Sequence, residues 1–305
     1  MANIALIDID SKNFPNIALM KISAYHKMLG DNVGDWYAWK TYDKIYKSKV
    51  FTFTKDLKVA NAKEVIQGGT GYNLENKLPI DIDNMFPDYS LYNITDTAYG
   101  YLTRGCPRQC AFCIVSKKEG IKTEQKYKLS QFWNGQKNIK LLDPNITAAP
   151  NSIELFEELA DTKAWVDFTQ GLDLRLMTEK KIEAIKKIKI KMMHFAWDNI
   201  EDEKIICEKL TMFKEMTNID YRKLTVYILT NFNTTFEQDL YRVYKVKELG
   251  ASPYVMVYNR QTAEKKYKLL QRYSKPVFRK IKTFEEYSGK YKKDVSANTG
   301  FNYGS

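Results

Sequence analysis

Alternating strand and helix patterns run through most of this 305-residue chain, and they restrict its fold more than any other feature. The clearest strand pattern is LTVYILT, residues 224–230, which is rich in β-branched and aromatic side chains. Thr235 and Gln238 then form a capping box that predicts a helix, and Gly250 ends it. Repeated strand–helix units require parallel strands, because each helix returns the chain to the same edge of the sheet. We therefore expect an α/β protein.

Residues 1–75 have the pattern of a small Rossmann-like domain. Pro15 suits the first turn of a helix, and Gly30 ends the helical spacing of apolar residues that follows. Strands are predicted before and after this helix, at residues 3–10, 49–54 and 64–67. A glycine turn at residues 68–71 follows, which is weak evidence for a phosphate site because it lacks the lysine of a P-loop.

The remainder of the chain predicts a linker, a larger domain and a tail. Residues 76–96 contain two prolines and few periodic apolar positions, so we expect a linker there. Residues 97–289 then predict a partial barrel of six strand–helix units with a C-terminal extension. Its predicted strands are residues 99–102, 139–143, 165–169, 191–197, 224–230 and 253–258, with helices at 152–160 and 178–188 among them. We expect the tail, residues 290–305, to be poorly ordered.

Composition bounds the compartment and the partners. Hydrophobic residues make up 44% of the chain, which excludes a disordered protein, and no apolar run is long enough for a membrane-spanning helix. The N-terminus lacks the basic start of a signal peptide, and four cysteines are too few for a disulfide framework, so we expect a cytoplasmic protein. The net charge of +11 favours an acidic partner such as nucleic acid or a nucleotide; the alternative is a lysine-rich solvated surface.

Three cysteines at C-x3-C-x2-C spacing form the most informative motif. Cys106, Cys110 and Cys113 follow a predicted strand directly, and three thiolates on one short loop can bind three corners of an iron–sulfur cube. One iron is then left without a protein ligand, and it can chelate a small molecule. Cys207 is far along the sequence. Structural zinc is the alternative, but it needs four ligands, and neither histidine of the chain is near the loop.

This motif, with Phe112 just before its third cysteine, resembles the cluster loop of the radical S-adenosylmethionine (SAM) superfamily. The resemblance covers about residues 97–260 and implies a 4Fe-4S cluster whose open iron chelates SAM. It also implies reductive cleavage of SAM to a 5′-deoxyadenosyl radical, and an electron donor such as flavodoxin or ferredoxin. The cofactors supply the chemistry, while the protein orients them and excludes water.

The resemblance also suggests SAM contacts at the predicted strand ends. Asp143 could accept from the SAM ammonium, or it could cap a turn. Arg175 could pair with the SAM carboxylate, or it could form a structural pair with Asp173. Weaker candidates share a place at a later strand end or inside a strand: Gln170, Asp198, His194, Asn231 and Asn233.

A Rossmann-like domain before the barrel is similar to the layout of cobalamin-binding radical SAM enzymes and methylthiotransferases. The cobalamin motif would place a histidine shortly after Asp10, where this chain has none, so the resemblance implies a degenerate domain, and cobalamin is not expected. Methylthiotransferases carry three further cysteines in this domain, and here no cysteine precedes Cys106. Two alternatives remain: a cobalamin-assisted methyltransferase, and a non-catalytic zinc or cluster module that docks nucleic acid.

Overall fold

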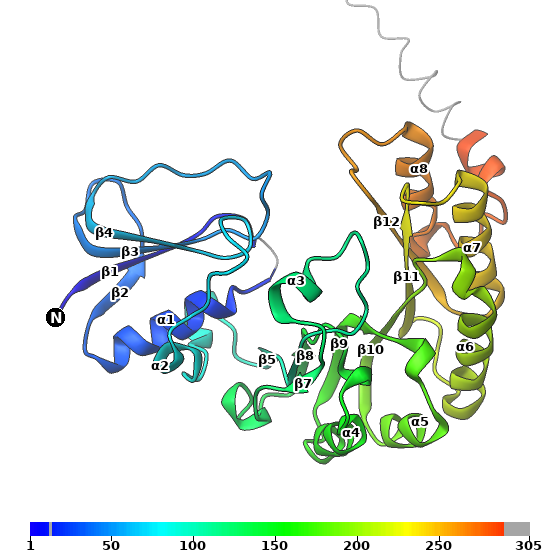
Figure 1. Ribbon diagram of the computed structural model, residues 1–305, viewed down its shortest axis with the longest axis horizontal. Coiled ribbons are helices and arrows are strands. Elements are labelled where there is room, and N and C mark those ends of the chain that lie inside the picture. Colours follow the sequence, from blue (N-terminus) through cyan, green and yellow to red (C-terminus); the bar gives the residue numbers. More distant parts are fainter. Residues whose placement is uncertain (12–13, 290–305) are drawn as a thin grey trace, which may run out of the picture. The chain divides into compact units, whose positions relative to one another are not determined.

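The computed structural model describes residues 1–11 and 14–289, and it is an α/β protein built on parallel sheets (Figure 1). The chain divides into two compact units, Met1–Asp167 and Phe168–Ser305. The predicted tail, residues 290–305, lies outside the described residues. Within the described ranges, no helix combines the length and the apolar character needed to cross a bilayer.

The first unit begins with a four-stranded parallel sheet in the order β2-β1-β3-β4. Helix α1 begins after Asn16, whose side chain accepts a hydrogen bond from the Leu19 amide, and Gly30 follows its end with a φ of +79°. Ile4 and Leu6 of β1 pack against α1, while Ala5 and Ile7 pack on the opposite face of the sheet. The bounds are β1 Asn3–Asp8, α1 Ile17–Met28, β2 Asn32–Asp35, β3 Tyr42–Ser48 and β4 Ala62–Gly68.

The predicted strand at residues 49–54 is wrong, because the strand lies just before it, at β3. Ile45 and Tyr46 of β3 are buried, and Lys47 buries its stem while its ammonium bonds Asp56. Lysines within β3 hide this strand from a hydropathy pattern. The prediction instead followed the aromatic propensity of residues 49–54, which the structure places in a loop. The short edge strand β2 was not predicted.

The segment predicted as a linker, residues 76–96, packs on the N-terminal sheet and α1. It contains helix α2 (Ile80–Asp83) and the 3₁₀-helix η1 (Tyr89–Tyr92). Ile82 is buried in the same core cluster as Leu6 and Leu19. The Lys21 ammonium on α1 donates to the Asp83 carboxylate at 2.9 Å. These contacts order the segment against the rest of the unit.

The second sheet has six strands in the order β12-β11-β10-β9-β8-β5, and the boundary between the two units falls within β9. The pairs β5–β8, β10–β11 and β11–β12 are parallel, and α7 packs against β11 and β12. Each strand predicted over residues 97–260 is present, and both sides of the Thr235–Gln238 capping box are formed. The strand bounds are β5 Thr97–Gly100, β8 Asn138–Leu141, β9 Trp165–Leu172, β10 Lys189–Ala196, β11 Leu224–Thr230 and β12 Ser252–Val257. The helices are α4 Ser152–Asp161, α5 Glu179–Lys186, α6 Glu203–Thr217, α7 Phe236–Glu248 and α8 Lys265–Tyr273.

Candidate metal centre

The three-cysteine motif lies on a loop that is closed at its base. Strands β6 (Thr103–Arg104) and β7 (Glu124–Gln125) pair in antiparallel fashion on either side of it. The Cys106 amide donates to the Gly120 carbonyl at 3.1 Å, and the Thr123 hydroxyl donates to the Gly105 carbonyl at 3.1 Å. We call residues 105–123 the cysteine loop. It includes the short helix α3 (Val115–Glu119), and its hydrogen bonds hold its two ends together.

Gly105 allows the two ends of the cysteine loop to approach this closely. Its φ of +86° is rarely adopted by other residues, and a Cβ there would lie 1.9 Å from the Lys122 carbonyl oxygen. The Gly105 amide also donates to the Glu119 carboxylate at 3.2 Å, and Arg104 pairs with the same carboxylate at 2.7 Å. The residue before the first cysteine is therefore fixed by sterics and by hydrogen bonding.

Asp143, two residues after the end of β8, anchors the chain that leads into the cysteine loop. Its carboxylate accepts from the Leu102 amide at 3.1 Å, from the Thr103 hydroxyl at 2.7 Å and from the Thr103 amide. Burial raises the pKa of this carboxyl to about 6, although these hydrogen bonds act in the opposite direction. The sequence left open a SAM contact or a turn cap for Asp143, and in the structure its oxygens bind the backbone before the cysteines.

Asn145 brings a side-chain amide to the first cysteine. Its Nδ2 donates to Cys106 Sγ at 3.5 Å, and the Thr147 hydroxyl donates to its Oδ1 at 2.6 Å. Because the hydroxyl occupies the oxygen side of the amide, the nitrogen side faces the sulfur. All three residues are buried. The sequence analysis did not select Asn145; its signal was its position two residues after Asp143, at the end of a predicted strand.

The thiols differ in exposure. Cys106 is buried, Cys110 and Cys113 are partly buried, and the Cys113 amide donates to the Cys110 carbonyl at 2.9 Å. Phe112 is partly buried on the same loop, and Cys207 lies on α6. Among the described residues, no three cysteine, histidine or carboxylate side chains converge as a metal-binding group. All four cysteines are free thiols.

The two histidines have partners away from the cysteine loop. His26 lies 2.8 Å from Asp31 and 2.9 Å from the Tyr46 hydroxyl. His194 on β10 bonds the Phe168 carbonyl at 3.1 Å and stacks on the Tyr227 ring. His194 is partly buried within its strand.

In the second unit, Arg175 is paired with acids. Its Nε donates to Asp173 at 2.7 Å, and its other nitrogens reach both Asp173 and Asp202. This is the structural pair that was the alternative to a SAM carboxylate contact. Two carboxylates around one guanidinium leave a net negative charge, which favours an ammonium or hydroxyl over a carboxylate as a further partner. Gln170 is exposed on β9.

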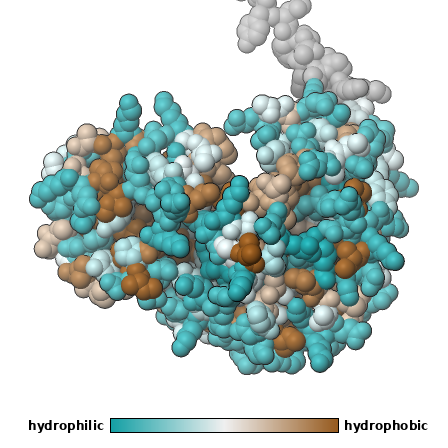
Figure 2. Space-filling view, in the orientation of Figure 1, coloured by the Kyte–Doolittle hydropathy of each residue, from teal (hydrophilic) through white to brown (hydrophobic). Residues whose placement is uncertain are grey.

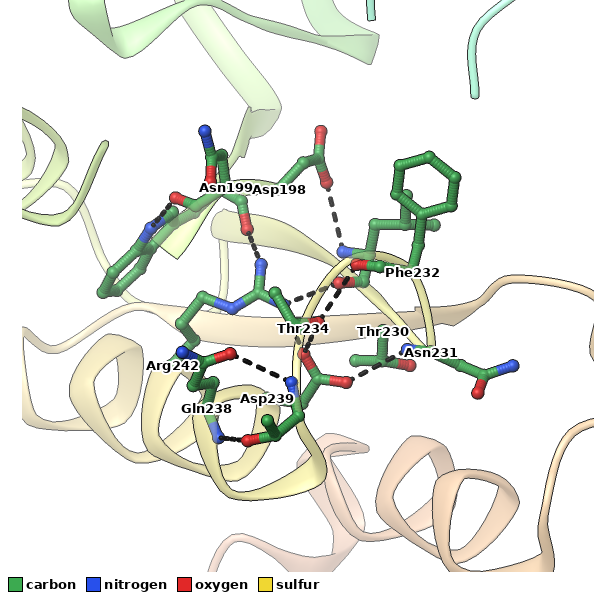
Figure 3. Close-up of polar contacts among 12 residues, drawn as sticks. Asp198, Asn199, Thr230, Asn231, Phe232, Thr234, Gln238, Asp239 and Arg242 are labelled. Carbon is green, nitrogen blue, oxygen red and sulfur yellow. Dashed lines mark hydrogen bonds and ion pairs between the residues drawn. The ribbon is translucent and has the colours of Figure 1, made fainter. Parts of the chain in front are cut away.

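Asp198 follows β10 and belongs to a separate network at the ends of β10 and β11 (Figure 3). Its carboxylate accepts from the Leu229 amide at 3.1 Å, and burial raises its pKa. Arg242 on α7, fully buried, donates to the carbonyls of Trp197 at 2.6 Å and Leu229 at 2.7 Å, and pairs with buried Asp239. Sequence reasoning missed this arginine because its helix pattern does not distinguish a buried cation from an exposed one.

Asp239 also fixes the loop between β11 and α7. It accepts from the Asn231 amide at 3.0 Å and from the Thr234 hydroxyl at 2.6 Å (Figure 3). Asn231 and Asn233 adopt positive φ values of 61° and 48°, which asparagine tolerates better than most residues. The structure therefore gives these two asparagines a backbone role in the loop.

The glycine turn after β4 has a packing role. A Cβ on Gly69 would lie 2.3 Å from the Lys49 carbonyl oxygen, and the Gly71 amide donates to that oxygen at 2.9 Å. The hydroxyl of Ser48, the last residue of β3, accepts from the Asn16 side-chain Nδ2 at 2.7 Å. Both features are accounted for by contacts inside the N-terminal sheet and its loops.

No family model matches the chain, and no curated protein matches its sequence.

Proposed function

We propose that this protein is a radical SAM enzyme with a partial (β/α)6 barrel, in which Cys106, Cys110 and Cys113 hold a 4Fe-4S cluster. The observation that carries the proposal is the cysteine loop itself. It presents three thiols within eight residues, is closed at its base, and follows the first strand of a six-stranded α/β sheet. When bound, such a cluster would chelate SAM at its open iron and supply the electron for reductive SAM cleavage.

The chain's own residues support this donor set. Three thiols match three corners of a cubane, and the loop holds them close in sequence without a fourth cysteine. The Asn145 amide already faces Cys106 Sγ, and an N–H donor of this kind stabilises a thiolate ligand. Asp143 and Gly105 fix the backbone on which the first ligand lies.

Anaerobic reconstitution of the full-length chain with iron and sulfide tests the proposal. We expect about four irons per chain, an electron paramagnetic resonance (EPR) signal after reduction with dithionite, and 5′-deoxyadenosine when SAM is added. Separate Cys106→Ala, Cys110→Ala and Cys113→Ala variants should lose the EPR signal and the product. Cys207→Ala, on α6, is the matched control and should retain both.

Two results would count against radical SAM chemistry. One zinc per chain without iron or sulfide would favour the metal-module alternative. A normal EPR signal without 5′-deoxyadenosine, in wild type and Cys207→Ala alike, would leave a cluster protein that does not cleave SAM. Formation of S-adenosylhomocysteine only with added cobalamin would indicate the methyltransferase alternative.

A further inference from the structure

Two phenylalanine rings are held in solvent on the loop that follows β3. Phe53 is 71% exposed and Phe51 is 47% exposed, and their rings stack at 5.2 Å between centroids. Phenylalanine is normally among the most buried residue types, so a stacked exposed pair requires an explanation. Hydrophobic residues interrupt the hydrophilic surface at several places in Figure 2.

This phenylalanine loop, residues 49–57, is fixed at both ends. The Asp10 carboxylate accepts from the amides of Val50 at 2.7 Å and Phe51 at 2.9 Å, and the Thr70 hydroxyl donates to the Val50 carbonyl. At the other end, the buried Lys47 ammonium bonds Asp56 at 2.9 Å and the Leu57 carbonyl at 2.7 Å. The rings are thus exposed on an ordered loop, which lowers the entropic cost of binding a partner.

A second exposed aromatic pair follows β2. In this tryptophan loop, residues 36–41, Trp39 is 79% exposed and its ring lies 5.0 Å from that of Tyr37. Asn61, which precedes β4, accepts from Trp36 Nε1 at 2.8 Å and donates to the Tyr37 carbonyl at 2.9 Å. Asn61 lies at the amino edge of the sheet, because β3 and β4 begin side by side at Tyr42 and Ala62. The tryptophan loop is therefore held at the opposite edge of the sheet from the phenylalanine loop, which follows the carboxyl end of β3.

The charge around these rings is positive. Residues 36–58 contain six lysines and two aspartates, and Lys40, Lys55 and Lys58 are exposed. Of the two aspartates, Asp56 bonds Lys47 and Asp43 bonds Lys63. The exposed lysines are therefore available for an anionic partner, in agreement with the net charge of +11.

We propose that the phenylalanine loop binds single-stranded nucleic acid. Unpaired bases would stack on Phe51 and Phe53, and backbone phosphates would contact the exposed Lys55 and Lys58. Flat rings beside lysines match the two chemical components of a single strand, base and phosphate, whereas a duplex keeps its bases stacked internally. The surface is independent of the cysteine loop, so it can be tested whether or not a cluster forms.

Fluorescence anisotropy with a labelled 12-nucleotide oligouridine tests this surface in the full-length protein. We expect Phe51→Ala/Phe53→Ala to weaken binding by about tenfold or more, because stacking contributes on this scale for each base. Tyr241→Ala, which removes an exposed ring on α7, should bind like wild type. Circular dichroism checks that each variant is folded. Phe53→Trp keeps an aromatic ring at this position, so it should retain the binding that Phe53→Ala loses.

The salt dependence separates phosphate contacts from general charge. Lys55→Ala/Lys58→Ala should reduce the slope of log K against log salt by about 1.4, or about 0.7 for each lost phosphate contact. Lys180→Ala/Lys189→Ala makes the same change in net charge elsewhere on the surface, and should leave the slope unchanged. Equal loss in both lysine variants, or tight binding in the phenylalanine double variant, would overturn the proposal. So would a dimer that the phenylalanine substitutions convert to monomer, since the rings would then contact a second copy.

Discussion

Asp143 accepts a hydrogen bond from the Thr103 hydroxyl at 2.7 Å, which joins the end of β8 to the first residue of β6. Asp143→Ala would leave three donors of the 102–103 segment without their acceptor, and we expect the free energy of unfolding to fall by about 3 kcal/mol. Thr103→Val removes one donor only and should cost about 1 kcal/mol. Urea unfolding of both variants measures the difference. Equal stability of wild type and Asp143→Ala would contradict the anchoring role.

The same carboxyl predicts a pH dependence. Its pKa is raised from 3.8 to about 6 by burial, so the folded state binds the proton more tightly than the unfolded state. The part of the stability that depends on this proton is therefore complete below pH 3.8 and is lost as the pH rises through 6. Between pH 4.5 and 7.5 wild type should lose about 2 kcal/mol relative to Asp143→Asn, which has no proton to exchange. Parallel stability curves for the two proteins would refute this assignment.

Asn145 predicts a shift in cluster potential that rests on the proposed function. Its amide donates to Cys106 Sγ, and such a bond stabilises the more negative, reduced cluster. Asn145→Ala should therefore lower the reduction potential by a few tens of mV, the scale of one hydrogen bond for a one-electron couple. Thr147→Val, which frees the amide to rotate, should give a smaller shift of the same sign. The measurement is a redox titration followed by EPR, with iron content as the control. Full iron content and unchanged potentials in both variants would show that the amide has no such effect.

The strand–helix alternation was predictable because it depends on local pattern. β11 at Leu224–Thr230 and the capping box of α7 agree with the predicted residues, since burial, propensity and turn chemistry coincide there. The first domain was harder to predict. The lysines of β3 obscure its strand, while Phe51 and Phe53 have strand propensity in a loop. Side-chain propensity alone does not reveal that a phenylalanine ring is exposed to solvent on a loop whose backbone is fixed by hydrogen bonds.

The sequence showed the three-cysteine motif of the candidate site, but not the distant residues that contact it or the other candidate residues. Cys106, Cys110 and Cys113 stand out by spacing, which is local. Asn145 lies 39 residues from Cys106 in sequence, and only strand pairing brings the two side chains together. The sequence left two alternatives for Arg175, a SAM contact or a structural pair with Asp173. In the structure its guanidinium also pairs with Asp202, 27 residues away, which a local pattern does not show.

The Arg242–Asp239 pair predicts a large energetic effect without any chemistry. Both side chains are fully buried, so removing one charge leaves the other without compensation. Arg242→Met should therefore destabilise the second unit by about 3–5 kcal/mol. Arg222→Met is the matched control, because Arg222 pairs with Asp220 at the surface and its loss should have no measurable effect on unfolding. If both variants unfold at the same urea concentration as wild type, the buried pair does not stabilise the loop ends.

Gly105 and Gly120 allow backbone strain to be separated from steric contact in the cysteine loop. Both have positive φ, +86° and +93°, so alanine at either should cost about 1–3 kcal/mol of conformational strain. A Cβ at Gly105 would also collide with the Lys122 carbonyl, whereas at Gly120 nothing lies within 4 Å. Gly105→Ala must therefore separate the two ends of the loop, and we expect it to lower iron incorporation on reconstitution well below that of Gly120→Ala. Circular dichroism should report a folded chain in both cases, because the change is confined to the loop. Equal iron content in the two variants would mean that the close approach at Gly105 does not govern the position of Cys106.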